Sequence, residues 1–323
     1  MFPHRAGGRG DRPSRRRPFA HAAVASVVLL GTMAAGAVYV TAQAHGSGEL
    51  VSSSAAPGAL EAAVESATAG TSAPGPGRTS PAAPTADLDT LLARAVGAVP
   101  VETGARVSVA VLDTESGESA VYGDGAFDTA SIVKVDILAA LLVRAQDTGR
   151  GLTAQERTYA AAMIRDSDNA SATALWKAIG QAEGLAEANE RLGLGGTEGG
   201  DGPLWGLTQT TAADQLVLLR QVFGDESELD EGSRACLRGL MGDIAAGQDW
   251  GVSAAGEAGS ALKNGWLPRS ATGLWVINSV GRVSADGREY LVAVLSDGNS
   301  TKEKGISLVE GAARAAVSVF AGA

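Results

Sequence analysis

Five short segments in which apolar and polar residues alternate constrain the fold of this chain most strongly. Alternation with a period of two predicts strands that bury one face. The segments are 106–113, 118–122, 260–267, 273–283 and 289–296. Asp286-Gly287, between the last two segments, favours a two-residue hairpin turn. A single antiparallel sheet is the expected arrangement of these strands.

Helical patterns surround and interrupt the predicted strands. Apolar residues have helical spacing from Asp87 onward, the stretch between Leu138 and about Gly247 is helical with glycine-rich breaks, and a final helix is expected over 305–320. The order of helix, strand pair, helices, strand triple and helix predicts an α+β fold. In that fold an antiparallel sheet is flanked by helices and an all-helical lobe is inserted between its strands.

The chain before this domain reads as an export segment and a linker. Arginines crowd the first 17 residues, an apolar run covers Ala22 to Val40, and Ala42-Gln43-Ala44 resembles a small-x-small cleavage site. Residues 1–44 are therefore predicted to be a signal peptide that is cleaved or an anchor that is retained. Residues 45–86, rich in Ala, Ser, Gly and Pro, are predicted to be a disordered linker. The domain at 87–323 is expected outside the cytoplasm, secreted or attached to the cell membrane.

Composition excludes several classes of function. The three histidines are His4, His21 and His45, so the domain lacks the residue needed for a Ser-His-Asp triad or a histidine metal site. Cys236 is the single cysteine, which rules out an intramolecular disulfide. A net charge of −10 with no basic patch in the domain argues against nucleic acid as a partner. No metal or organic cofactor is implied, and a monomer is the expectation.

Ser131 occupies the expected start of a long helix. Asp128 and Thr129 offer side-chain oxygens for an N-cap, and Gly149 follows the apolar helical stripe. In the first turn, free backbone N–H groups and the helix dipole favour developing negative charge. Lys134 shares the face of Ser131, so an amine and a hydroxyl can meet there. This pair suits an acylating serine enzyme.

Lysine is scarce in this chain, which gives Lys134 more weight. The lysines are Lys134, Lys177, Lys263, Lys302 and Lys304, whereas arginine supplies the other basic residues. An ammonium group can lose its proton and a guanidinium cannot, so a lysine beside Ser131 indicates a base. The alternative is an ordinary surface lysine.

Two further motifs follow in order. Ser167-Asp168-Asn169 is rare by chance, although it also suits an N-cap cluster opening a helix at 170–179. Lys263-Asn264-Gly265 lies on a predicted strand, where an exposed lysine followed by a bulge glycine is the plain alternative. A second Ser-x-x-Lys, Ser260 to Lys263, falls on that same strand. Residues three apart on a strand point to opposite faces, so it cannot form a serine–lysine pair.

Together the three motifs resemble those of the penicillin-recognising serine enzymes, in particular the class A β-lactamases. The resemblance covers about 87 to 321, including the strands before Ser131 and around Lys263. It implies the two-lobed β-lactamase/transpeptidase fold with the site between the lobes. The interval from Ser131 to Ser167 is shorter than is usual in class A enzymes, which implies a shortened helical lobe.

The resemblance implies a role for each motif residue. Ser131 resembles the nucleophile, and Lys134 resembles the base that takes its proton directly or through a relay. Ser167 resembles the hydroxyl that protonates the departing amide nitrogen. Lys263 resembles the cation that attracts the substrate carboxylate and tunes Ser167. Asn169 resembles the side chain that holds the substrate's amide carbonyl.

The strand after Lys263 is implied to bind substrate through Asn264, Gly265 and Trp266. The oxyanion hole implied by the resemblance is the backbone N–H of Ser131 with that of Trp266. Asn264 replaces the usual threonine or serine, which removes a hydroxyl that would contact the substrate carboxylate. Trp266 is bulky where a small residue is usual, so it would narrow the pocket or stack on the substrate.

The deacylation machinery is where the chain departs from class A enzymes. Their Glu-x-x-Leu-Asn pattern is missing, and the corresponding region is a glycine-rich stretch at 195–208. Its two carboxylates, Glu198 and Asp201, are weak candidates for positioning a water and are better suited to a solvated turn. A deacylation base is worth roughly two to four orders of magnitude in rate. We therefore expect an acyl-enzyme that forms and is hydrolysed slowly.

Three functions remain open on the sequence alone. The first is an extracytoplasmic serine hydrolase of the class A β-lactamase type, acting on a β-lactam or on a cell-wall peptide or related amide. The second is a D-alanyl-D-alanine carboxypeptidase-like penicillin-binding enzyme, which the missing glutamate favours. The third is a non-catalytic cell-envelope binding module of the same fold, against which the intact motif residues argue.

Overall fold

A computed structural model describes residues 87–320 of the chain. The predicted export segment and linker lie outside these residues, so the domain boundaries stay predictions. None of the helices in the described range is long and apolar enough to cross a membrane.

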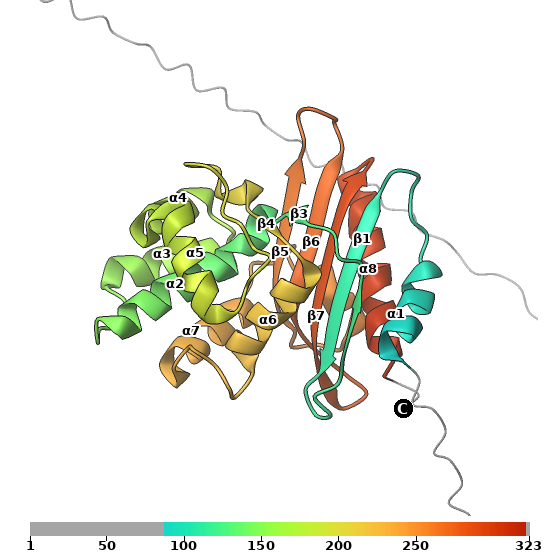
Figure 1. The fold of residues 1–323 in the computed structure, drawn as a ribbon, viewed down its shortest axis with the longest axis horizontal. Coiled ribbons are helices and arrows are strands. Elements are labelled where there is room, and N and C mark those ends of the chain that lie inside the picture. Colours follow the sequence, from blue (N-terminus) through green and yellow to red (C-terminus); the bar gives the residue numbers. More distant parts are fainter. Residues whose placement is uncertain (1–86, 321–323) are drawn as a thin grey trace, which may run out of the picture. The chain divides into compact units, whose positions relative to one another are not determined.

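A five-stranded antiparallel sheet forms the centre of the domain, with the strand order β2-β1-β7-β6-β5 (Figure 1). Its strands are β1 (Arg106–Asp113), β2 (Ser119–Tyr122), β5 (Ala261–Pro268), β6 (Trp275–Ala285) and β7 (Arg288–Asn299). The five predicted strands are confirmed. Asp286 and Gly287 have φ values of 51° and 76° and join β6 to β7, as the Asp-Gly pair predicted.

Eight α-helices accompany the sheet in the described range. They are α1 (Leu88–Gly97), α2 (Val133–Asp147), α3 (Ala154–Arg165), α4 (Asn169–Ile179), α5 (Gln181–Leu192), α6 (Ala212–Phe223), α7 (Glu231–Gly242) and α8 (Lys302–Ser318). Short 3₁₀ helices are η1 (Ala130–Ile132), η2 (Trp205–Leu207) and η3 (Val252–Ala255), and β3 (Phe127–Asp128) pairs with β4 (Gln209–Thr210). The predicted α+β fold with an inserted helical lobe is confirmed.

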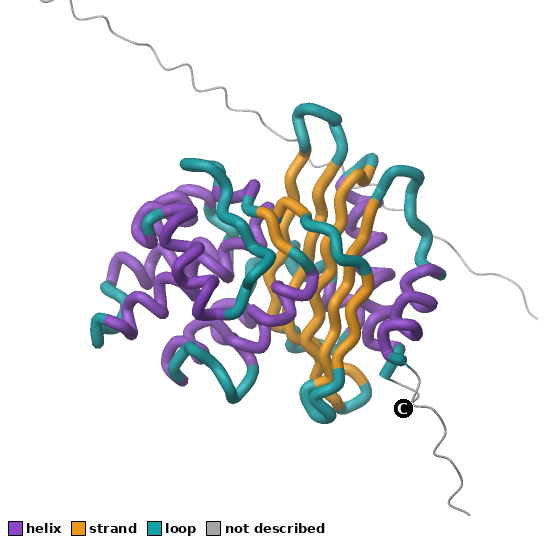
Figure 2. Tube along the Cα trace, in the orientation of Figure 1, coloured by secondary structure: helices purple, strands orange, loops and turns teal. Residues whose placement is uncertain are grey.

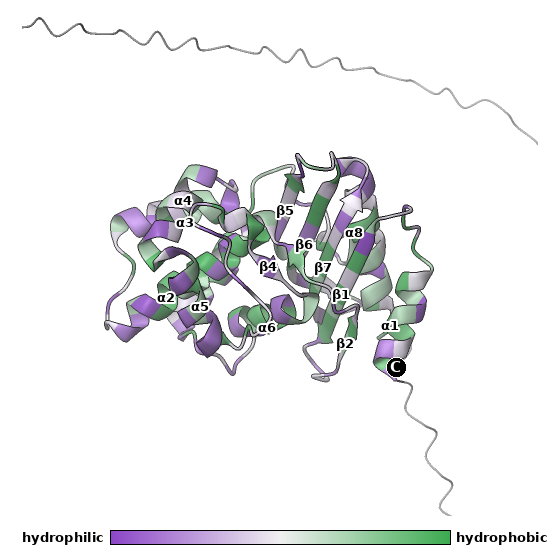
Figure 3. Ribbon diagram, turned by 45° about the horizontal axis from the view of Figure 1, so that its top comes forward, coloured by the Kyte–Doolittle hydropathy of each residue, from purple (hydrophilic) through white to green (hydrophobic). Residues whose placement is uncertain are grey.

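The alternation along the strands separates two cores. On β7, Leu291 and Leu295 pack with the helical lobe, whereas Val292 and Val294 pack with the helices α1 and α8. Figures 1 and 2 show α1 and α8 against one face of the sheet and the lobe α2–α7 on the other side. In Figure 3 hydrophobic residues dominate the strands, whereas α1 and α3 carry mixed residues. The period of two thus builds a sheet that is buried on both faces.

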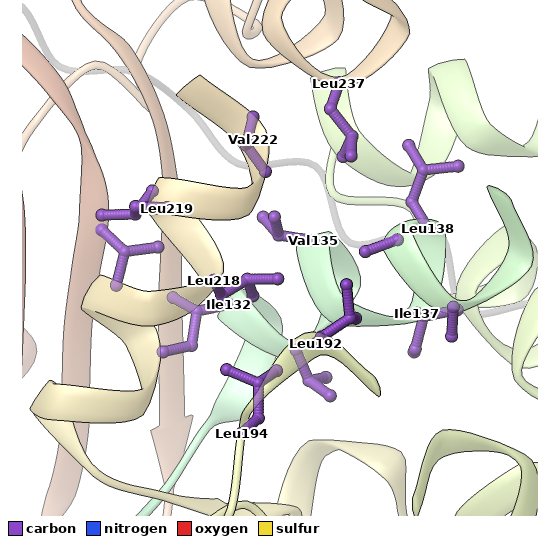
Figure 4. Packing of buried hydrophobic residues seen from close by; sticks show 14 of the residues in the cluster. Ile132, Val135, Ile137, Leu138, Leu192, Leu194, Leu218, Leu219, Val222 and Leu237 are labelled. Carbon is purple, nitrogen blue, oxygen red and sulfur yellow. The ribbon is translucent and has the colours of Figure 1, made fainter. Parts of the chain in front are cut away.

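Helix α2 is the centre of the helical lobe, and nearly every residue of it is buried. Val135 and Leu138 pack among side chains from α5, α6 and α7, including Leu192, Leu218 and Leu237 (Figure 4). A helix that is buried on nearly all sides belongs to the core of its lobe. Because α2 directly follows η1, this packing fixes the position of Ser131 and Lys134.

The predicted N-cap of this helix is wrong. The helix α2 begins at Val133, two residues after Ser131, and has no side-chain cap; Ser131 lies in η1 instead. Asp128 is held in β3, where its carboxylate accepts a hydrogen bond from Gln209 and pairs with Arg269. Strand pairing has therefore turned this carboxylate away from the helix end that the sequence placed it beside.

Candidate active site

Strand β6 fixes the backbone just before Ser131 through side-chain hydrogen bonds. Asn278 on β6 donates hydrogen bonds from Nδ2 to the carbonyl oxygens of Asp128 (2.8 Å) and Thr129 (3.0 Å). Ala130 has a φ of 48°, a conformation that non-glycine residues rarely adopt. Such strain costs roughly 1–3 kcal/mol and persists only where the surroundings fix it. Ser131 is therefore presented by a constrained turn.

Gly265 on β5 packs directly against this turn. A Cβ at this position would lie 2.7 Å from the Thr129 carbonyl oxygen and 2.9 Å from the Ser131 nitrogen. Only glycine leaves room for that approach. The backbone of β5 thus lies directly beside the N–H of Ser131, and the oxyanion hole formed with Trp266 stays a prediction. The bulge suggested as the alternative for Gly265 does not occur, since β5 and β6 pair in register there.

Lys134 lies at the centre of a buried polar cluster. Its Nζ donates hydrogen bonds to the Ser167 carbonyl (2.7 Å), to Ser167 Oγ (3.0 Å) and to Asn169 Oδ1 (2.8 Å). Burial lowers the pKa of Lys134 to about 7, although the negative charge of Asp168 opposes this. A substantial fraction of neutral amine is thus available near pH 7. The surface-lysine alternative is wrong, because the side chain is fully buried.

Ser131 is not hydrogen-bonded to Lys134, so the two predicted routes for its proton, direct or through a relay, differ in what the structure offers them. Among the bonds of residues 87–320, Lys134 Nζ is bonded to Ser167 and Asn169, and none joins it to Ser131 Oγ. The hydroxyl that is hydrogen-bonded to the Lys134 amine is therefore Ser167 Oγ. The bond between Lys134 and Ser167 is one of the two links that a relay from Ser131 to Lys134 would need.

The N-cap interpretation of the 167–169 motif is confirmed by Asp168, whereas the catalytic role of Ser167 stays a prediction. Asp168 is the N-cap of α4 and accepts a hydrogen bond from the Ser171 nitrogen (2.6 Å). Ser167, with a φ of 57°, instead directs its carbonyl and hydroxyl toward Lys134. The cap fixes the helix end, and the strained residue before it supplies the polar contacts.

Lys263 is a second buried amine on the sheet side of the site. Its Nζ donates to the Asn264 carbonyl at 3.1 Å. Burial, followed by the positive charge of Lys134, lowers the pKa of Lys263 to about 7. The two amines therefore influence each other, and carrying both charges at once is unfavourable.

Asn264 does not join this site. Its side chain is buried, and Nδ2 donates to the carbonyls of Gln248 (2.8 Å) and Trp250 (2.9 Å), so it fixes the segment before η3. Trp266 does face the cavity, with Trp250 at 6.0 Å between ring centroids and Lys302 Nζ 4.4 Å from its own ring centroid. Of the three strand residues predicted to bind substrate, the structure thus brings only Trp266 to the cavity wall.

A cavity of about 600 Å³ opens at Ser131. It is lined by Ala130, Ser131, Asn169, Thr173, residues 203–207 and residues 266–271. Ser131, Asn169 and Trp266 were predicted from the sequence to be site residues. A concave, largely apolar site with a few polar groups is typical of small-molecule binding.

Residues 145–320 match the family model described as the beta-lactamase enzyme family. The chain belongs to that family. The matched range begins after Ser131 and Lys134, and a search of curated proteins gives no match.

Solved structures of PBP-A and of β-lactamases show the same fold as this β-lactamase-family chain at low identity. One is a point mutant of PBP-A, an acyl-enzyme complex with penicillin G, at a TM-score of 0.62 and 21% identity over 72% of this chain and 97% of the other. Another is a β-lactamase from Burkholderia phymatum, at a TM-score of 0.60 and 19% identity over 72% of this chain and 99% of the other. A third is a β-lactamase from Xanthomonas campestris, at a TM-score of 0.56 and 20% identity over 71% of this chain and 95% of the other. At these identities the likeness establishes the fold.

In this β-lactamase-family chain, an aromatic residue faces the lysine. Lys134 Nζ lies 5.0 Å from the ring centroid of Trp205, and Trp205 Nε1 donates to Thr173 Oγ1 at 3.2 Å. Glu198 and Asp201 do not line the cavity. Sequence reasoning missed Trp205 and Thr173. A lone tryptophan in the glycine-rich stretch 195–208 was the available signal.

Proposed function

We propose that this member of the β-lactamase family is an extracytoplasmic serine hydrolase, acylated at Ser131 by a β-lactam or related amide and deacylated slowly. The observation that carries the proposal is the buried Lys134 bonded to Ser167 and Asn169 beside the Ser131 cavity. A lysine with a pKa near 7 can serve as a base at neutral pH, which ordinary lysines cannot.

The proposed acylation step uses Ser131, Ser167 and Lys134. Ser131 Oγ attacks the amide carbonyl while its proton passes through Ser167 Oγ to neutral Lys134. The backbone N–H groups of Ser131 and Trp266 bind the oxyanion that develops on the carbonyl oxygen. When the carbon–nitrogen bond breaks, Ser167 Oγ gives a proton to the departing nitrogen and regains one from Lys134. Charged Lys263 attracts the carboxylate of the substrate.

Deacylation lacks an evident base. Among the described residues, the cavity lining contains no carboxylate, and the ring of Trp205, which faces Lys134, has no basic group to activate a water. Losing such a base lowers the rate by roughly two to four orders of magnitude. The same observation favours the second candidate, a carboxypeptidase-like penicillin-binding enzyme, because a slowly hydrolysed penicillin ester is what such an enzyme forms.

Intact-protein mass spectrometry with penicillin G tests the proposal. The expected result is a stable adduct equal to the mass of the penicillin, absent in Ser131→Ala and nearly absent in Lys134→Arg. Loss of the drug's absorbance without an accumulating adduct would mean fast deacylation and would contradict the slow step. Neither adduct nor turnover would favour the non-catalytic binding module. Activity on a D-alanyl-D-alanine peptide, with release of D-alanine, would distinguish the carboxypeptidase.

A further inference from the structure

Lys134 carries its amine into a buried site where its hydrogen-bond partners are all uncharged. They are the Ser167 carbonyl, Ser167 Oγ and Asn169 Oδ1. Burial lowers the pKa of Lys134, and the negative charge of Asp168 opposes this. The carboxylate of Asp168 is occupied as the N-cap of α4, where it accepts a hydrogen bond from the Ser171 nitrogen. Any further group that favours the charged amine therefore acts on an ammonium that has lost its hydration.

The face of the Trp205 indole ring lies over this amine. Lys134 Nζ is 5.0 Å from the ring centroid. A cation within about 6 Å of an aromatic face is attracted by the negative potential of the ring, most strongly by tryptophan and most strongly where water is excluded. Lys134 is fully buried, whereas Arg282, which lies over the Phe223 ring at 5.2 Å, is partly exposed. The contact of Lys134 is therefore the less screened of the two.

Trp205 is held in this orientation from α4. Its Nε1 donates a hydrogen bond to Thr173 Oγ1 at 3.2 Å. Thr173 lies four residues after Asn169 on the same helix, so one face of α4 supplies both an acceptor for Lys134 and the anchor for the ring. The ring is thus fixed beside the amine by the element that also fixes the amine.

The charged and neutral forms of Lys134 use these contacts differently. The ammonium donates three N–H groups to its three oxygen partners. The neutral amine keeps two N–H groups and a lone pair, and of the three partners only Ser167 Oγ carries a hydrogen that it can donate to this lone pair. The attraction to the Trp205 face exists only for the ammonium. The ring therefore favours the form that Lys134 reaches after it accepts a proton.

We propose that Trp205 is a positioning residue that stabilises the charged form of Lys134 through the face of its ring, and that Thr173 holds the ring in place. The inference rests on the proposed function, in which Lys134 accepts the proton of Ser131 and becomes charged. It adds the uncharged group that stabilises this charge in a buried site.

The ionisable groups that the elements around Lys134 bring to this part of the molecule stay the same when Trp205 is replaced. They are Asp168 before α4, Lys263 on β5, Asp136 on α2, and Glu198 and Asp201 in the stretch that carries Trp205. A change in the titration of Lys134 in a Trp205 variant therefore reports on the ring.

NMR of the full chain labelled with carbon-13 at the lysine Cε atoms measures the effect without any substrate. The chain has five lysines, and the signal that is missing in Lys134→Arg identifies Lys134. Trp205→Leu replaces the ring by an apolar side chain that has no aromatic face, and we expect the pKa of Lys134 to fall by at least ~0.5. Trp205→Phe keeps an aromatic face and should lower the pKa by less than about half as much.

Thr173→Val tests the anchor of the ring. It removes the acceptor of Trp205 Nε1, so it should lower the pKa of Lys134 in the wild-type protein and leave it unchanged in Trp205→Phe, because phenylalanine has no N–H to hold. An equal effect in both proteins would refute the role of Thr173. The matched control is Phe223→Leu, which removes a ring that faces Arg282 and does not line the Ser131 cavity. This control should leave the titration of Lys134 unchanged.

Acylation by penicillin G from pH 5 to 9 connects the ring to the reaction. The acidic limb of the rate should move to lower pH in Trp205→Leu by the amount that NMR shows for the pKa of Lys134. A lower pKa with an unmoved limb would keep the contact with the ring and refute its part in the reaction.

The two measurements separate this inference from the proposed function. An unchanged pKa in Trp205→Leu would overturn the inference, and so would a higher pKa, which would mean that the ring acts by excluding water. If the wild-type protein is still acylated in either case, the hydrolase stands. If the pKa falls as expected but penicillin G does not acylate Ser131, the hydrolase proposal fails and the stabilising contact stands. An unchanged pKa together with no acylation would overturn both.

Discussion

Under the proposed mechanism, acylation of Ser131 should follow a bell-shaped pH profile, because that mechanism requires one of the two buried lysines neutral and the other charged. In it Lys134 is neutral to accept a proton, and Lys263 is charged to attract a carboxylate. Burial lowers the pKa of each to about 7, and the charge of Lys134 also lowers that of Lys263. The productive state of the pair therefore carries a single positive charge, which is on Lys263 and not on Lys134.

The size of the effect follows from these pKa values. With a pKa of about 7 for both lysines, about a quarter of the molecules combine neutral Lys134 with charged Lys263 at pH 7 and roughly one in a hundred at pH 5, so the second-order rate of acylation should fall ~25-fold between these two values. Above pH 7 the rate should fall again as Lys263 loses its proton. This alkaline limb should weaken for a substrate that has no carboxylate.

Asp168→Asn assigns the acidic limb to Lys134. The carboxylate of Asp168 raises the pKa of Lys134, so removing its charge should move the limb to lower pH. Asparagine is as good an N-cap as aspartate, so α4 keeps its cap. Quenched mass spectrometry or stopped-flow absorbance from pH 5 to 9 measures both proteins. A flat wild-type profile, or an acidic limb that does not move in Asp168→Asn, would refute the assignment of Lys134 as the base.

Three further changes should have distinct effects. Burial raises the pKa of Asp136 to about 7, so the contribution of this residue to stability declines as the pH rises from about 4 to 7. Asp136→Asn should therefore raise the Tm, measured by calorimetry, more at pH 8 than at pH 4.5. An equal shift of the Tm at both pH values would contradict this. Gly265→Ala puts a methyl group against the backbone of Ser131. We expect a loss of about 1–3 kcal/mol in the free energy of unfolding together with at least ~100-fold slower acylation. A fully active protein in the adduct assay would be inconsistent with the close packing. Trp205→Ala opens the space beside Lys134, so the acyl-enzyme lifetime followed by mass spectrometry should shorten; an unchanged lifetime would show that the ring does not exclude water.

The elements that the sequence predicted correctly depend on local rules. The alternation over 273–283 and 289–296, with Asp286-Gly287 between them, led to β6, β7 and their turn because the side-chain period and the turn geometry are properties of neighbouring residues. The order of the three motifs likewise indicated the fold. Lys134, Ser167 and Asn169 meet in one cluster, although their roles stay predictions.

The errors arose where long-range contacts decide the outcome. Asp128 suits an N-cap by type and position, but pairing of β3 with β4 and contact with Arg269 use its carboxylate elsewhere. Asn264 lies beside Lys263 in the sequence, yet its amide binds carbonyls of residues 248 and 250, which no strand pattern could indicate. Trp205 reaches Lys134 through the fold of a glycine-rich segment that has no periodicity. Each case depends on a partner distant in the sequence.

Strain at two residues explains why so many buried contacts surround the site. Ala130 and Ser167 both have left-handed backbone conformations, and each would relax if its neighbours allowed it. Asn278 holds the turn around Ala130 from the sheet, and Lys134 holds the Ser167 carbonyl from α2. Because the two restraints belong to different lobes, the relative position of Ser131 and Ser167 is set by the packing of the sheet against α2. The turn that carries Ser131 is thus in place before a substrate arrives, which is the condition under which the fixed dipoles of the predicted oxyanion hole would stabilise a developing oxyanion most effectively.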